Sequence, residues 1–318
     1  MKKKNVLLIA GGGTLGTYAS EELLRLGHLV DVICLEDKIS DNENLTFYKS
    51  YATNEFLEEL FSKKHYDGII NFIHYPDVDE YKPVHKLLTA NTDHLIFLSS
   101  YRAYADLQNP ITESAPFLLD VSTDKKFLAE EDYALSKAKA EKFIREESGT
   151  KNWTIVRPVI SFSDKRLDIV TINGHVVLDN KKAGKPVILP ENVKNLTAGL
   201  DWSGNTGKII ANLLFKENTL GEAYTISSAQ NLSWGEVADL YTELAGTEFK
   251  WIDRDEWLRH DEYIQNSYWA AVYDRFFDRK IDNSKVLKAA GLKKEDFKSI
   301  KEGLKIELAK AEMAGGTK

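Results

Sequence analysis

Short apolar runs alternate with segments of helical spacing through the first half of the chain. The apolar runs cover residues 6–10, 29–35, 68–73, 94–99 and 153–156. They contain few polar residues, which is typical of parallel strands buried on both faces. Helical spacing falls between them, at residues 18–26, 54–64, 81–90 and, as one long helix, 125–147. Repeated strand–helix units predict an α/β fold with a Rossmann-type doubly wound parallel sheet.

The alternation stops after Pro158. Residues 168–190 carry scattered Val, Ile and Gly without clear helical spacing, and helices return near residues 209–215, 234–245 and 302–312. We therefore expect an NAD(P)-binding Rossmann domain at residues 1–165. A smaller substrate-binding region should follow at residues 166–318.

A glycine-rich loop follows the first predicted strand. Gly11, Gly13 and Gly16 fit the pattern G-x-G-x-x-G, with Thr14 and Leu15 inside it, and a helix is predicted to follow. Such glycines let the backbone approach a pyrophosphate, and the helix start offers free N–H groups to it. The motif alone is weak, but its place between a strand and a helix is what dinucleotide binding requires. The sequence therefore predicts a site for NAD or NADP.

The acid that should bind the adenosine ribose is less clear. Glu36 and Asp37 lie about 20 residues beyond Gly16 and follow the second strand, where such an acid is expected. An ordinary acidic loop explains them equally well. Lys38 is near but no arginine is, so the choice between NAD and NADP stays open, with NAD slightly favoured.

Tyr133 and Lys137 stand four residues apart in the long predicted helix, on one face. A phenol with a pKa near 10 becomes a base near neutral pH only where positive charge stabilises the phenolate. An ammonium one turn away supplies such charge, which suits proton removal from an alcohol whose hydride leaves for a cofactor. Ser99 or Ser100, at a strand end, could hold the same substrate oxygen. In a chain with 14 tyrosines this spacing is expected about once by chance, so the order of the motifs carries the argument.

The composition argues against several classes of protein. A net charge of −7 argues against a general nucleic-acid surface, which needs clustered Lys and Arg. The single cysteine, Cys34, allows no internal disulfide and no cysteine-based metal site, so we expect a cytoplasmic protein without a metal. No apolar run approaches the roughly 20 residues of a membrane span.

The motifs occur in a recognisable order. They are AGGGTLG (residues 10–16), IFLSSYRAYAD (96–106), PITESAP (110–116), YALSKAKAE (133–141), TIVRP (154–158), GEAYTISSAQNLSW (221–234) and DNSKVLKAAG (282–291). This order resembles the extended short-chain dehydrogenase/reductase superfamily, in its NAD-dependent epimerase/dehydratase branch, over nearly the whole chain.

The resemblance implies roles for particular residues. Ser100, Tyr133 and Lys137 match the family's catalytic serine, base and lysine. Lys137 would also hold the nicotinamide ribose, and Pro158 would begin the segment beside the nicotinamide. The family also implies that the chain returns to the sheet edge after residue 195, and that it forms a homodimer through its long helices.

The sequence departs from the family pattern at several positions. Ala10 replaces the first glycine of the loop, and Cys34 stands where the ribose-binding acid is usual. Ser50-Tyr51 replaces the Gly-Asp that contacts the adenine. The residues after Pro158 lack the family's Asn and Tyr-Gly-Pro turn, which help to seat nucleotide sugars. Such changes also resemble the atypical chloroplast stem-loop-binding proteins.

Two functions follow as hypotheses. The first is an NAD(P)-dependent oxidoreductase or epimerase acting on a sugar-like, possibly nucleotide-linked, secondary alcohol through Ser100, Tyr133 and Lys137. The alternative is a non-catalytic NAD(P)-binding regulator or RNA-associated protein. A further pair, Asp274 and Arg275, lies in an aromatic run; we interpret it as a surface ion pair rather than part of a pocket. Tyr101 and His74 are interpreted as ordinary neighbours of the site.

Overall fold

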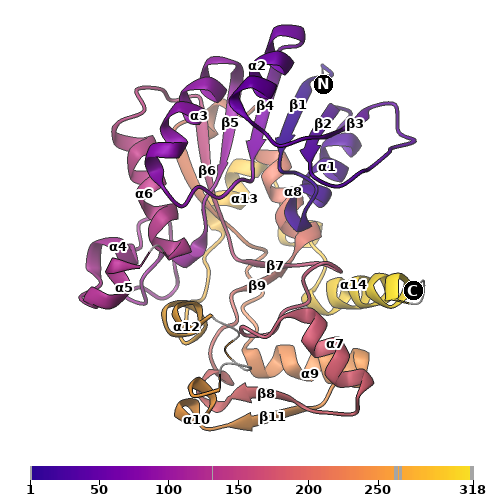
Figure 1. Cartoon of the computed structure of the whole chain (residues 1–318), viewed down its shortest axis with the longest axis vertical. Coiled ribbons are helices and arrows are strands. Elements are labelled where there is room, and N and C mark those ends of the chain that lie inside the picture. The colour runs from indigo at the N-terminus through magenta and orange to yellow at the C-terminus, as the bar shows by residue number, and fades with distance from the viewer. Residues whose placement is uncertain (1, 131, 261–263, 265–266, 316–318) are drawn as a thin grey trace.

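The computed structural model describes residues 2–130, 132–260, 264 and 267–315. A larger unit holds a parallel sheet between two helical layers, and a smaller unit lies below it (Figure 1). No helix in the described part of the chain is both long and apolar enough to cross a membrane.

Seven parallel strands form the sheet, in the order β10-β6-β5-β4-β1-β2-β3. Their bounds are β1 Asn5–Ile9, β2 Leu29–Cys34, β3 Leu45–Lys49, β4 Tyr66–Asn71, β5 Thr92–Leu98, β6 Trp153–Pro158 and β10 Glu222–Ile226. The strand order reverses between β1 and β4. In such sheets, ligands bind beyond the carboxyl ends of the strands at that reversal.

Alternate side chains of the strands pack against opposite helical layers. Leu8 packs with the layer of α1 (Thr14–Arg25), α8 (Ser203–Leu213) and α13 (Ser284–Ala290). Leu7 packs with the layer of α2 (Asn54–Lys63), α3 (Val78–Ala90) and α6 (Tyr133–Glu146). Both leucines are fully buried, so the sheet is covered on both faces, as the apolar runs predict. The predicted Rossmann-type fold is confirmed.

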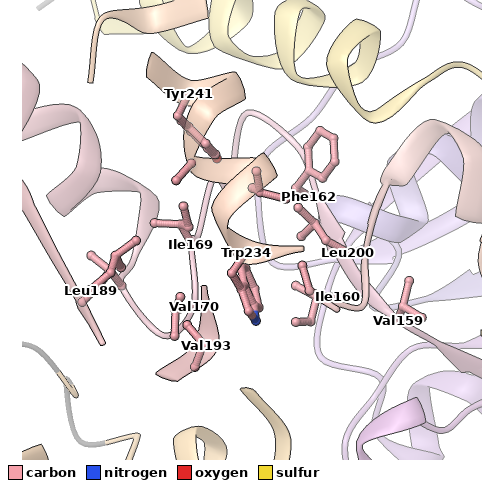
Figure 2. Packing of buried hydrophobic residues seen from close by; sticks show 14 of the residues in the cluster. Val159, Ile160, Phe162, Ile169, Val170, Leu189, Val193, Leu200, Trp234 and Tyr241 are labelled. Carbon is pink, nitrogen blue, oxygen red and sulfur yellow. The ribbon is translucent and has the colours of Figure 1, made fainter. Parts of the chain in front are cut away.

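The smaller unit has a core of its own. Figure 2 shows Trp234 and Tyr241 of one helix packed among aliphatic side chains from the segments before it. Its elements are α7 Gly174–Lys182, β8 Val187–Pro190, α9 Trp234–Ala245, β11 Phe249–Ile252, α10 Arg254–Leu258, α12 Tyr268–Ala270 and α14 Ile300–Gly315. A two-stranded pair, β7 (Ile160–Phe162) with β9 (Leu200–Trp202), lies between the units (Figure 1).

Short helical turns complete the chain. They are α4 Leu118–Val121, α5 Lys125–Ala129, the 3₁₀ turns η1 Tyr101–Ala103, η2 Glu191–Val193, η3 Glu217–Thr219 and η5 Lys294–Asp296, and the π turn η4 Ala271–Arg275.

Two expectations about secondary structure are wrong. The single helix expected over residues 125–147 is two helices, because Asp124 and Asp132 each cap a separate helix start with a side-chain carboxylate. Residues 168–190, expected to lack a helix, contain α7 and β8. Helix α7 has Gly174 first and buries only one large side chain, Val177, so it shows little periodicity.

Candidate active site

The glycine loop connects β1 to α1 and is tightly packed on one side. A Cβ at Gly16 would lie 2.3 Å from the carbonyl oxygen of Gly11, and one at Gly11 would lie 2.7 Å from the Cβ of Leu8. Only glycine allows this approach of helix to strand. Ala10 has a φ of 57°, a conformation that favours glycine, at the position where the family's first glycine is expected.

The other side of the loop is open. No atom lies within 4 Å of a Cβ built at Gly13, which caps α1 without a side-chain hydrogen bond. The residues of this helix start line a cavity of about 550 Å³. Free N–H groups and the positive end of the helix dipole therefore face space that a pyrophosphate could occupy.

A second cavity of about 370 Å³ lies beside the end of β2. Ala10 and Gly13 line both cavities, so the two adjoin at the glycine loop. Cys34 and Glu36 line the second one. This arrangement fits a dinucleotide, with its adenosine half beside β2 and its nicotinamide half beside the larger cavity.

Tyr133 faces the larger cavity at the first position of α6. Ser100, which follows β5, lines the same cavity, and its hydroxyl favours the phenolate. Burial raises the pKa of Tyr133, while the positive charge of Arg102 opposes that rise most strongly. The structure thus brings together the serine and tyrosine that the sequence singles out. Pro158, at the end of β6, lines the same cavity.

Lys137 lies behind Tyr133 and is not among the residues that line either cavity. Its ammonium nitrogen is 5.5 Å from the centre of the Tyr133 ring and donates a hydrogen bond of 2.6 Å to the carbonyl oxygen of Leu98. His74 covers the other side of the phenol, with its ring centre 4.7 Å from that of Tyr133. Lys137 can therefore influence the phenol through its charge, whereas the sequence also suggests a contact with ribose.

The two neighbouring serines of the strand end have different partners. Ser99 donates a hydrogen bond of 2.5 Å to Glu141, which forms a buried ion pair with Arg157. Arg157 in turn donates to the hydroxyl of Tyr104 at 2.6 Å. Tyr104, the second tyrosine of the strand-end motif, is therefore part of the supporting structure rather than of the cavity.

Three arginines are the charged residues among the described residues that line the larger cavity: Arg102, Arg166 and Arg275. Asp274 is fully buried and forms ion pairs with Arg102, Arg275 and Arg279. The interpretation of Asp274 and Arg275 as a surface ion pair is therefore wrong, because the aromatic segment folds inward over the cavity. The sequence feature that could have indicated this inward position is a charged pair inside an aromatic run. Tyr101, interpreted as an ordinary neighbour, also lines the cavity.

Burial of Lys137 makes the stability of the fold depend on pH. Its pKa is lowered to about 7, because loss of water disfavours the ammonium more than Glu141 stabilises it. An unfolded lysine titrates near 10.4, so between pH 7 and about 10 the folded state has released a proton that the unfolded state keeps. The contribution of Lys137 to the free energy of unfolding therefore rises with pH in that window and is least favourable below pH 7.

We expect Lys137→Met to reduce the gain in the free energy of unfolding from pH 6 to pH 9 by about 2 to 3 kcal/mol. Urea denaturation at the two pH values measures the difference. Lys139→Met, on the exposed side of α6, is the control and should leave the gain unchanged. An unaltered pH dependence in Lys137→Met would mean that the buried amine keeps its ordinary pKa.

Solved structures of this fold cover the chain almost from end to end. The UDP-glucose 4-epimerase of Thermotoga maritima, solved with UDP-glucose, has a TM-score of 0.70 at 16% identity, over 98% of this chain and 99% of its own. The enzyme WbmH of Bordetella bronchiseptica, in complex with NAD+, has a TM-score of 0.69 at 16% identity, over 97% and 98%. The epimerase Mth375 of Methanothermobacter thermautotrophicus has a TM-score of 0.71 at 13% identity, over 99% and 95%.

The chain shares the fold of these three structures. No protein-family model matches the sequence, and no curated protein matches it. Sequence identities this low establish the fold alone, and the chemistry of the chain depends on the residues of its own site.

Proposed function

We propose that the protein is an NAD(P)-dependent epimerase or related oxidoreductase that acts on a secondary alcohol of a nucleotide-linked sugar. The observation that carries the proposal is that Tyr133 and Ser100 line the same cavity as the open helix start at Gly13. The cofactor would supply a hydride acceptor when bound. The glycine loop would hold its pyrophosphate.

The chain's own groups would then move the proton. Ser100 would donate a hydrogen bond to the substrate oxygen, and the Tyr133 phenolate would take the hydroxyl proton from it. The Arg102 guanidinium and the Lys137 ammonium each lie 5.5 Å from the centre of the Tyr133 ring. The charge of Arg102 would stabilise the phenolate, and Lys137 would add to this in its protonated form. In an epimerisation, Tyr133 would then give the proton back to the sugar oxygen.

The charge of the cavity supports an anionic substrate. Arg275 is almost fully buried and still lines the cavity, and the one carboxylate that pairs with it, Asp274, is shared with two other arginines. A diphosphate between nucleoside and sugar carries the charge that such guanidinium groups bind well. The related fold in Thermotoga maritima was solved with UDP-glucose, which belongs to this class.

The proposal is tested by titration of cofactor-free protein with NAD, NADH, NADP and NADPH, followed by a screen of UDP-sugars with the cofactor that binds. We expect micromolar affinity for one oxidised and reduced pair, and interconversion of one pair of UDP-sugars, followed by chromatography of the sugars. Neutral sugars without the nucleotide should react far more slowly.

The second candidate is a cofactor-binding protein without turnover. The position of Lys137 favours it, since the ammonium lines neither cavity. Tight binding of a cofactor without conversion of any substrate in the screen would support this candidate. Failure of all four nicotinamide nucleotides to bind would reject both candidate functions.

A homodimer through α3 and α6, which pack against each other on one face of the sheet, is also proposed, and the mass in solution tests it.

A further inference from the structure

Two lysines from distant parts of the sequence meet at the glycine loop. Lys38 follows β2 and Lys165 follows β7, and their ammonium nitrogens donate hydrogen bonds of 2.9 and 2.7 Å to one carbonyl oxygen, that of Gly12. Both ammonium groups are therefore within range of each other's charge. The pKa of Lys165 is lowered, first by burial and then by the charge of Lys38. Two cations held together on a neutral acceptor form a ready site for an anion.

The position of Gly12 shows which part of a dinucleotide this site would meet. Gly12 lines the cavity beside β2 and is not among the residues that line the larger cavity of Tyr133. A Cβ at Gly12 would lie 2.7 Å from both the Cβ of Cys34 and a carboxylate oxygen of Glu36. The lysines therefore stand at the end of β2, where a bound dinucleotide places its adenosine ribose. The pyrophosphate would lie farther along the loop, at the start of α1.

The acidic residues near the end of β2 do not form the arrangement that would exclude a 2′-phosphate. An acid at the end of β2 accepts hydrogen bonds from the ribose hydroxyls and repels a 2′-phosphate. Cys34 occupies that end here and carries a buried thiol whose pKa is raised by burial. Glu36 is near, and the charges of Lys38 and Lys165 both act on its carboxylate. The group of three has one negative and two positive charges.

The segment that carries Lys165 is fixed to the cofactor loop. The backbone N–H of Asp164 donates to Glu307 at 2.8 Å, and Ser163 donates to the hydroxyl of Thr14, the first residue of α1, at 3.2 Å. These bonds hold Lys165 beside the loop, so binding of an anion there needs no large rearrangement.

From this geometry we propose that Lys38 and Lys165 bind the 2′-phosphate of NADP and make the chain select NADP over NAD. The selectivity would differ from WbmH and WbmG, whose structures were solved with NAD. The inference concerns the cofactor site only, and it does not depend on whether Tyr133 performs a reaction.

Calorimetric titration with 2′,5′-ADP and 5′-ADP tests the proposal without any substrate. We expect the wild-type protein to bind 2′,5′-ADP at least tenfold more tightly than 5′-ADP. Lys38→Met and Lys165→Met should each weaken 2′,5′-ADP by about tenfold or more, the usual effect of removing a charge-assisted hydrogen bond, and should change 5′-ADP by less than about twofold. Lys49→Met is the matched control, because Lys49 is a nearby exposed lysine that pairs with Asp37. The same panel with NADP and NAD, read by thermal stabilisation, should give the same order.

Three results would overturn the inference. Equal affinity of the wild-type protein for the two nucleotides would show that nothing recognises the 2′-phosphate. An equal loss of both nucleotides in the variants would assign the lysines to the shared 5′-phosphate groups. If neither nucleotide binds, the cofactor site fails together with the proposed function. Tight and selective binding of 2′,5′-ADP without turnover of any sugar would leave the inference standing and reject the reaction alone.

Discussion

Tyr133→Phe is expected to abolish most turnover while leaving cofactor affinity within about twofold of wild type. Loss of the phenol removes the group that accepts the substrate proton, and such groups contribute factors of about 10² to 10⁴. The ring stays, so its packing against His74 and its contact with Arg102 are kept. The measurement is the rate of sugar interconversion at saturating cofactor, with affinity from calorimetry. Wild-type activity in the variant would reject Tyr133 as the acid/base.

Two further variants make this result specific. Tyr48→Phe removes a hydroxyl from β3, away from both cavities, and should leave the rate unchanged. Ser100→Ala should slow the reaction because it removes the hydroxyl that lies in the cavity with Tyr133. Ser99→Ala, one residue earlier, should lower stability, since Ser99 bonds the buried Glu141, and should slow the reaction less than Ser100→Ala does. If both serine variants lost activity equally without loss of stability, the separate assignment of the two serines would be wrong.

The sheet and the glycine loop could be predicted from the sequence because their signals are local. An apolar run that is buried on both faces needs no knowledge of its neighbours, and G-x-G-x-x-G encodes contacts within one strand–turn–helix unit. The break in the helix over residues 125–147 also has a local signal, in the capping residues Asp124 and Asp132. The sequence prediction missed the break because the residues on both sides of it have helical spacing.

The charge of the site depends on long-range packing and could not be predicted. Arg275 reaches the cavity because its segment lies against the turn that holds Arg102, with Asp274 paired to Arg102. The two lysines at Gly12, Lys38 and Lys165, come from loops more than a hundred residues apart. Likewise, the sequence placed Lys137 on the face of Tyr133 but could not show that its ammonium is buried behind the phenol. In each case the sequence gives the residue type but not the residue that it contacts in the fold.

Arg157→Met is expected to lower the free energy of unfolding by about 3 to 5 kcal/mol. Arg157 and Glu141 are both almost completely buried and form two hydrogen bonds, of 2.8 and 2.5 Å. Removing the guanidinium leaves a carboxylate in the interior without its counter-ion, which costs far more than the pair itself contributes. Urea denaturation of wild type and variant measures the loss. Arg145→Met is the control: Arg145 is an exposed partner of the same Glu141 at 3.7 Å, and its loss should cost less than about 1 kcal/mol.

The same network connects stability to the site. Glu141 holds Ser99 at the end of β5, so it fixes the strand end that presents Ser100 to Tyr133. Adding Glu141→Leu to Arg157→Met removes the unpaired charge and should recover part of the lost stability. It should not recover turnover, because the hydroxyl of Ser99 then loses its acceptor and the strand end is no longer held. Recovery of both stability and turnover in the double variant would show that the ion pair serves the fold only, and that the positions of Ser100 and Tyr133 are set by the strand and helix alone.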